Sequence, residues 1–240
     1  MIAGIAWRVA LVAVALVTAG VQLDRQSEKT PAFAQSVPAP LRSVAQLPIA
    51  AYALDADNHA YTLAEAERLV RRRPLPALHL RILAQAQFVA GEADQSALTI
   101  QYAAQRGWRE PLAQESVLRL ALANSDMPEA ARRFAALFLR RDTEDALLEE
   151  LAPQVLAEPG GEGRETLITI VGGGDRWHNQ FLRRGSRVMP ADAFTEIVRV
   201  TMENGTRYDC SVLESLVRSL TRRDANSGAE YSTLVEAHCQ

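Results

Sequence analysis

Apolar residues recur every three or four positions between residues 62 and 158, which is the period of an amphipathic helix. Proline, glycine and acidic residues interrupt this period and mark helix ends. No alternation of the kind expected for strands interrupts the pattern, so the sequence predicts an all-α chain. The expected helices are TLAEAERLVRRR, PALHLRILAQAQFVAG, EADQSALTIQYAAQRG, REPLAQESVLRLALANSD, MPEAARRFAALFLRRD and TEDALLEELAPQVLAE.

Small residues occupy regular positions in FVAGEADQSALTIQYAAQRGW, which covers residues 88–108. Gly91 predicts the turn out of one helix, and Ser96 and Ala103 allow the next helix to approach its neighbour closely. Self-comparison gives the best match when the sequence is shifted by 34 positions. This shift aligns Leu83 with Val117, Ala84 with Leu118, Ser96 with Ala130, Ile100 with Phe134, and Ala103 with Leu137.

A 34-residue period of helix–turn–helix units resembles the tetratricopeptide repeat. Two repeats are readable, with flanking units that are degenerate. The signature aromatic residue is replaced by Gln87 and Ala121, and the closing proline by Trp108 and Asp142. The resemblance implies a solenoid of antiparallel helix pairs. The positions that match the family pattern are Pro74, Leu80, Leu83, Ala84, Gly91, Ser96, Ile100 and Ala103.

In such a solenoid the first helix of each pair lines a concave surface. Arg81 and Glu115 occupy equivalent positions in successive repeats, and Gln85 and Arg119 follow one turn later. Residues four apart share one helix face, so these four side chains predict a polar stripe that contacts a protein partner. The alternative is that they satisfy one another, Arg81 with Glu115 in particular.

The N-terminal stretch MIAGIAWRVALVAVALVTAGVQL, residues 1–23, is apolar apart from Arg8 and a few small or weakly polar residues. We expect a transmembrane anchor or signal segment, and we favour an uncleaved anchor. A cleaved signal peptide remains open, with a cut after Ala19 or Ala34, and a buried core helix is the third interpretation. The flanking charges hardly decide the orientation.

Residues 24–48 carry several prolines among small and polar residues, a composition that predicts an extended, semi-flexible spacer. We therefore expect four parts: the anchor or signal segment at 1–23, the linker at 24–48, helical repeats at 49–158 and a helical extension at 159–240.

The extension begins with glycine-rich loops around ETLITIV, which fits either a helix or a strand. The spacing of Gly172, Gly173 and Gly174 does not match a phosphate-binding loop, and Asp175 is expected to cap the next helix. Four further helices are expected, as is capping by Thr143 before TEDALLEE and by Asp209 before CSVLESL. Cys210 and Cys239 begin and end the last helical pair, so a disulfide between them is a candidate in an oxidising compartment.

The net charge is −3 and gives no reason to expect nucleic acid as a partner. Lys29 is the only lysine among 26 basic residues, a bias that we attribute to codon usage. Arg71, Arg72 and Arg73 are expected to complement the dipole at the end of their helix. No catalytic constellation, metal-ligand spacing or cofactor motif is apparent, so we predict neither enzyme activity nor a cofactor.

These features predict a membrane-tethered scaffold for protein–protein interaction in the bacterial cell envelope. The resemblance suggests polysaccharide export or envelope assembly as its setting, with a single pass through the inner membrane and the main domain in the periplasm. Signal cleavage and secretion to the periplasm is the alternative localisation, and a cytosolic main domain is a third. The alternative function is an envelope enzyme or ligand-binding domain in the C-terminal third, built around Asp175, His178 and Arg183.

Overall fold

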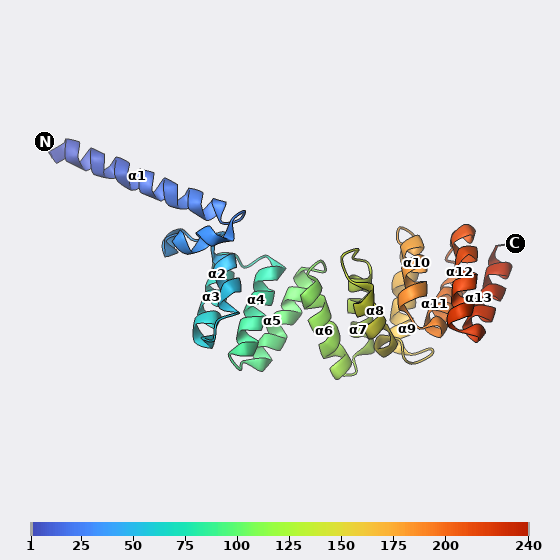
Figure 1. Cartoon of the computed structure of the whole chain (residues 1–240). Helices are drawn as coiled ribbons and strands as arrows, with labels where there is room; N and C mark the ends of the chain where they lie inside the picture. The colour runs from blue at the N-terminus through green and yellow to red at the C-terminus, as the bar shows by residue number, and fades with distance from the viewer. Residues whose placement is uncertain (1, 240) are drawn as a thin grey trace. The chain divides into compact units, whose positions relative to one another are not determined.

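The computed structural model describes residues 2–239, and it contains helices but no strand over this range (Figure 1). The prediction of an all-α chain is thereby confirmed. The chain divides into two compact units, which we call unit 1 (residues 1–110) and unit 2 (residues 111–240). This division falls inside the predicted repeat region, 49–158, rather than at either of its ends.

Unit 1 consists of a long N-terminal helix, a short irregular segment and two helix pairs. Within it α2 packs against α3, α3 against α4, and α4 against α5. Its elements are α1 (Ile2–Gln26), the 3-10 helices η1 (Pro31–Ser36) and η2 (Ala39–Leu41), α2 (Gln46–Ala53), α3 (His59–Arg72), α4 (Ala77–Val89) and α5 (Ala93–Arg106).

Small and polar residues fix the turns and close contacts of these pairs. Asn58 caps α3 by accepting a hydrogen bond from the backbone N–H of Tyr61 at 3.1 Å. Gly91 makes the turn into α5 with a φ of 85°, a conformation that favours glycine. The hydroxyl of Ser96 donates to the Ala84 carbonyl at 2.7 Å, and Ala103 is fully buried. The expected roles of these small residues are confirmed.

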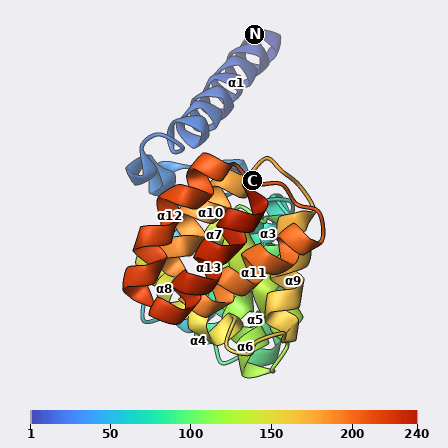
Figure 2. The same ribbon diagram turned by 90° about the vertical axis from the view of Figure 1, so that its right-hand side faces the viewer.

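Unit 2 consists of the helices from α6 onward. Here α6 packs on α7, α7 on α8 and α9, and α11 on α9 and α13. The final pair, α12 and α13, lies side by side (Figure 2). The bounds are α6 (Pro111–Ala123), α7 (Met127–Phe138), α8 (Asp145–Val155), α9 (Glu162–Gly172), α10 (His178–Val188), α11 (Ala191–Glu203), α12 (Cys210–Arg223) and α13 (Ala225–His238).

A continuous apolar core runs through unit 2 from α6 to α13. Its centre is a chain of buried aromatic rings in which each ring contacts the next at centroid distances of 5.6 to 6.2 Å. Such contacts add to the stabilisation from area burial alone. The rings belong to Phe134, Phe138, Phe181, Phe194 and Tyr231.

A buried arginine fastens the loop before α8. The Arg184 guanidinium donates from Nε to Asp145 at 2.8 Å and from Nη1 to the carbonyls of Phe138 and Arg140, each at 2.6 Å. It also donates to the carbonyl of Thr143. The prediction that the Thr143 side chain caps α8 is wrong, because the helix begins at Asp145 and Thr143 serves the loop through its backbone.

Two other predicted caps have opposite outcomes. The Asp209 side chain accepts from the Ser211 N–H at 2.9 Å and caps α12, as expected. Asp175 does not cap α10, because that helix begins only at His178 and its N-cap position, Trp177, supplies no side-chain bond. The ETLITIV stretch, left open between helix and strand, forms part of α9.

The helix boundaries carry the 34-residue period that the sequence comparison suggested. Helices α3, α5 and α7 begin at His59, Ala93 and Met127, each separated from the next by 34 residues. Helices α4 and α6 begin at Ala77 and Pro111, with the same separation. The recurrence therefore extends from residue type to the places where helices start.

Candidate functional site

The first candidate site is the apolar surface of α1. Its segment Gly4–Gln26 is long and apolar enough to cross a membrane, with a mean hydropathy of 2.0. Side chains such as Trp7 and Leu16 are about two-thirds exposed (66% and 68%), so the protein itself does not cover them. The helix is thus a candidate membrane anchor or signal sequence.

Asp24 joins the end of this helix to the rest of unit 1. Its carboxylate accepts backbone N–H bonds from Ser43 at 2.8 Å, Val44 at 3.0 Å and Ala45 at 2.9 Å, and the residue is only 5% exposed. These N–H groups lie directly before α2 and have no helical partner of their own. Hydrogen bonds to a charged acceptor are stronger than neutral ones, so Asp24 fixes α2 to the end of α1.

Apolar contacts reinforce this junction. A small cluster of Ala34, Val37, Ala45 and Ile49 is buried there, with Leu23 and Leu41 packed against it. The Leu41 side chain lies so close to Gly20 that a Cβ on that glycine would come within 2.4 Å of it. The segment 24–48 is therefore folded onto the end of α1, contrary to the prediction of a semi-flexible spacer.

The folded junction bears on the two cleavage positions suggested by the sequence. Ala34 is fully buried within η1, and a cut after it would separate Asp24 and Leu23 from the contacts just described. A cut after Ala19 would leave both contacts in place. The structure thus disfavours the later position as a processing site of the folded protein.

Arginines near helix ends form a recurring contact that the sequence analysis missed. Arg72 donates to the carbonyls of Ala39 and Arg42, and Arg106 donates to the Pro74 carbonyl at 2.7 Å. In unit 2, Arg223 donates to the carbonyls of Ser186 and Met189. A planar guanidinium suits such paired acceptors better than an ammonium group does. For the two in unit 1 the available signal was the spacing, since Arg72 and Arg106 are 34 residues apart.

The predicted polar stripe is occupied by contacts within each unit. In unit 1 the Nε atom of Arg81 lies 2.9 Å from Glu110, and its Nη1 donates to Gln85 at 2.7 Å. In unit 2, Arg119 pairs with Glu115 and also with Glu150, both at 2.9 Å.

The hydrogen bonds to Glu150 and Glu115 raise the pKa of Arg119. The Arg119 side chain remains 45% exposed, whereas that of Arg81 is only 16% exposed. Of the two, Arg119 is the better placed to meet a partner, although its charge is already balanced.

Exposed apolar side chains distinguish unit 1. Among the described residues beyond α1, only Leu112 in unit 2 is a large hydrophobic residue with an exposed side chain. All the others lie in unit 1, on η1, α2, α3, α4, α5 and the loops at the ends of α3 and α5. They are Phe33, Tyr52, Tyr61, Leu75, Phe88, Val89, Leu98, Tyr102 and Trp108.

The residues proposed for a site in the C-terminal third are not brought together. His178 is buried, its Nε2 atom lies 2.9 Å from the Val171 carbonyl, and its ring packs on Tyr208. Asp175 and Arg183 are both exposed, and neither contacts the imidazole in any interaction that the structure records. His178 therefore serves packing.

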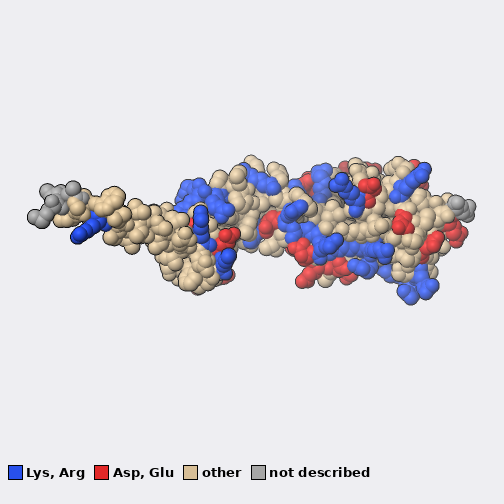
Figure 3. Space-filling model, turned by 90° about the horizontal axis from the view of Figure 1, so that it is seen from above, with Lys and Arg blue, Asp and Glu red and all other residues tan. Residues whose placement is uncertain are grey.

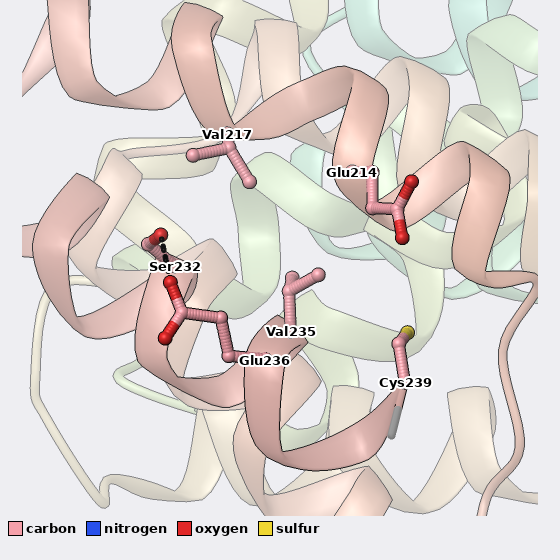
Figure 4. Close-up of a pocket in the computed structure, with 6 residues that line it drawn as sticks. All are labelled: Glu214, Val217, Ser232, Val235, Glu236 and Cys239. Carbon is pink, nitrogen blue, oxygen red and sulfur yellow. Dashed lines mark hydrogen bonds between the residues drawn. The ribbon is translucent and has the colours of Figure 1, made fainter.

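The structure joins Cys210 and Cys239 in a disulfide between the start of α12 and the end of α13, with Cα atoms 5.8 Å apart. Beside it is a shallow groove of about 350 Å³ (Figure 4). Glu214 and Val217 contribute from α12, while Ser232 donates to Glu236 at 3.4 Å within α13. The groove is lined by two carboxylates, a serine hydroxyl and a cysteine that is held in the disulfide.

Among residues 2–239, no group of three or more histidine, cysteine or acidic side chains is placed to hold a metal ion. Comparisons with protein families, with curated proteins and with solved structures gave no match. The tetratricopeptide likeness thus rests on the residues and helix boundaries of this chain alone.

Proposed function

We propose that this protein is a membrane-anchored interaction scaffold whose unit 1 holds other proteins close to the membrane. The observation that carries the proposal is the set of exposed apolar side chains on unit 1, the same unit that includes the apolar helix α1. Exposed aromatic side chains, which this set includes, are enriched at the centres of protein interfaces.

The outward face of α5 has the composition of a protein interface. Leu98 and Tyr102 are one turn apart and are 53% and 57% exposed. The exposed residues beside them include Gln95, Gln101 and Gln105, with the charged Asp94 and Arg106 one turn away at either end. Interface centres are rich in aromatic residues and poor in charge, because a buried unpaired charge is costly.

A tetratricopeptide-like stacking of the helix pairs is part of this proposal. It is supported by the 34-residue separation of helix starts and of Arg72, Arg106 and Arg140. It is also supported by buried small or apolar residues at equivalent positions in α3, α5 and α7, namely Ala66, Ile100 and Phe134. Within unit 1, stacked helix pairs would present successive helices as one binding surface.

The location proposed is the cell envelope of a bacterium, with one pass through the inner membrane and both units in the periplasm. The disulfide between Cys210 and Cys239 supports export, because such bonds persist in oxidising compartments. The folded junction at Asp24 supports retention of the segment up to Ala34, and the length and hydropathy of α1 are what favour its use as an anchor. Polysaccharide export or envelope assembly remains the setting that the resemblance suggests.

The scaffold proposal is tested by replacing Leu98 and Tyr102 with glutamine in the full-length, membrane-embedded protein. Both positions are exposed, so the folded state should be retained, and the circular dichroism spectrum checks this. Crosslinked partners are then recovered and compared quantitatively with those of wild type. We expect the loss of at least one partner that is specific to wild type.

The matched control changes Arg132 and Arg218 to glutamine, two exposed positions in unit 2, and should leave recovery unchanged. Equal recovery of partners by the Leu98/Tyr102 variant and by this control would exclude the α5 face from the interface.

Two further experiments test other parts of the proposal. Replacing Arg119 with glutamate tests whether the polar stripe contacts a partner. An alkaline phosphatase fusion after Gln240 tests on which side of the membrane the main domain lies. An inactive but stable fusion would contradict the periplasmic assignment.

A further inference from the structure

Basic side chains gather where α1 ends. They come from the last turn of α1, the segment after it and the last turn of α3. Figure 3 shows blue side chains grouped over the part of unit 1 that follows α1. We call this group the basic collar; its members are Arg25, Lys29, Arg42, Arg71 and Arg73.

Contacts within unit 1 join the collar residues at and after the end of α1 to those at the end of α3. Arg72 donates to the carbonyls of Ala39 and Arg42, which holds the last turn of α3 against the segment 38–42. Leu41, in the same segment, lies against Gly20 of α1. The collar is therefore fixed close to the end of the apolar helix and does not depend on a flexible spacer.

Neighbouring carboxylates leave the collar with a positive surplus. The Asp24 carboxylate is turned inward to backbone N–H groups. Glu67 pairs with Arg71 at 3.1 Å, which leaves Glu28 as the other exposed acidic residue in these segments. Arg25, Lys29 and Arg73 have exposed side chains, so they are free to meet anions outside the protein.

We propose that the basic collar binds the phosphate headgroups of anionic phospholipids. This inference rests on the proposed retention of α1 as a membrane anchor. An inserted α1 places the collar at the level of the headgroups, because its apolar stretch ends at Leu23 and the collar starts at Arg25. Each basic group near an anionic surface contributes roughly a fivefold gain in lipid affinity.

Phe33 supports a lipid surface as the occupant. Its ring is 41% exposed within η1, which packs on α1 beside the collar. Aromatic rings and arginine or lysine side chains are the residue types that gather at membrane–water interfaces. The collar thus combines phosphate-binding groups with an aromatic residue in the segment that directly follows the apolar helix.

The experiment replaces Phe33 with p-benzoylphenylalanine and reconstitutes the full chain into nanodiscs. Phosphatidylglycerol and phosphatidylcholine are present in equal amounts, and mass spectrometry counts the lipid adducts after illumination. We expect phosphatidylglycerol adducts to exceed phosphatidylcholine adducts by about fivefold. The excess should fall in high salt, which screens exposed charges.

Matched variants separate charge at the collar from charge elsewhere. Replacing Arg25, Lys29 and Arg73 with glutamine should bring the adduct ratio close to one, while Arg72 keeps the fold of the junction. Replacing Arg207, Arg218 and Arg222, three exposed arginines of unit 2, should leave the excess intact.

Three results would overturn the lipid inference: equal adducts in the wild type, an excess that survives the collar substitutions, or no lipid adducts in an anchored protein. The same sample also tests whether α1 is retained as a membrane anchor. A chain that alkaline carbonate releases from membranes, or whose intact mass lacks residues 1–19, contradicts retention of α1 whatever the adduct ratio.

Discussion

The two units bury their apolar residues in different ways. Unit 2 has one continuous core that reaches from Leu118 to Val235, tied by a disulfide. In unit 1 the apolar contacts include two smaller clusters, one around Leu69 and Ile82 and one around Val37 at the junction. Unit 1 leaves aromatic and aliphatic side chains exposed, and unit 2 hardly does so. Unit 1 is therefore the unit whose apolar surface a partner could cover.

Arginines bound within the fold occur in both units. In unit 2 the buried Arg164 donates to the Leu156 carbonyl at 2.9 Å and pairs with Asp192 at 2.6 Å. It also pairs with Glu196, so the guanidinium is satisfied inside the fold. Both units also leave arginines exposed, and in unit 1 the exposed ones include Arg25 and Arg73 near the end of α1.

The largest expected effect comes from truncating the core of unit 2. Phe181→Ala removes a ring that contacts Trp177, Phe138 and Phe194. We expect the free energy of unfolding of unit 2 to fall by about 3–5 kcal/mol. Amide hydrogen exchange in α4 should remain unchanged, because α4 belongs to unit 1. Faster exchange throughout both units would show that they unfold together.

Removing the disulfide should have the next largest effect. Cys210→Ser with Cys239→Ser releases a loop with a sequence separation of 29 residues. The expected loss is about 2–4 kcal/mol in unit 2, measured by urea unfolding. The reduced wild-type protein is the control and should match the double variant. A variant as stable as the oxidised protein would show that α12 and α13 are held by packing alone.

In unit 1 we expect a loss of stability when the junction between α1 and α2 is disrupted. Asp24→Ala removes an acceptor shared by three backbone N–H groups, and we expect a loss of about 1.5–3 kcal/mol. Exchange should rise at residues 43–50 while α12 stays protected. Glu28→Ala, an exposed neighbour, is the control. Unchanged protection in Asp24→Ala would mean that the apolar contacts alone hold the segment to α1.

The smallest expected effect is a different acid response of the two units. Burial lowers the pKa of His79 in unit 1, so protonation favours the unfolded chain. The stability that the folded protein has while His79 is neutral is fully present above about pH 6.5. It is lost as the pH falls through the folded-state pKa.

In unit 2, burial tends to raise the pKa of Asp145, but the hydrogen bond and charge of Arg184, with those of Arg187, lower it overall. Its contribution is present above about pH 3.9 and is lost as the pH falls further. As the pH is lowered, the urea midpoint of unit 1, measured by hydrogen exchange, should therefore decline before that of unit 2. His79→Gln should remove the early decline of the urea midpoint in unit 1. If the midpoints of both units declined at the same pH in this variant and in wild type alike, the assignment of the early decline to His79 would be contradicted.

Local signals explain what could be predicted from the sequence. Helix ends set by Gly91 and Asp209 depend on neighbouring residues, and these were located correctly. The folded segment after α1 was missed because the partners of Asp24 lie 19 to 21 residues away. A proline-rich composition says nothing about such a distant contact.

The candidate site was less predictable for a related reason. Arg81 and Glu115 occupy equivalent repeat positions, but they do not pair with each other. Arg81 forms an ion pair with Glu110, and Glu115 forms one with Arg119. Pairing depends on which carboxylate lies nearest in space, which the repeat period does not specify. The exposed face of α5 was also missed, because Leu98 and Tyr102 have the spacing of core residues and only the packing of α4 shows that they face outward.

The central claim is that the exposed face of α5 in unit 1 binds other proteins. It is tested most directly by photo-crosslinking in native membranes, with p-benzoylphenylalanine placed at Tyr102 on α5 or at the exposed Thr233 on α13. The account predicts discrete protein adducts from position 102 and none from position 233. Adducts from position 233 alone, or the same adducts from both positions, would contradict it.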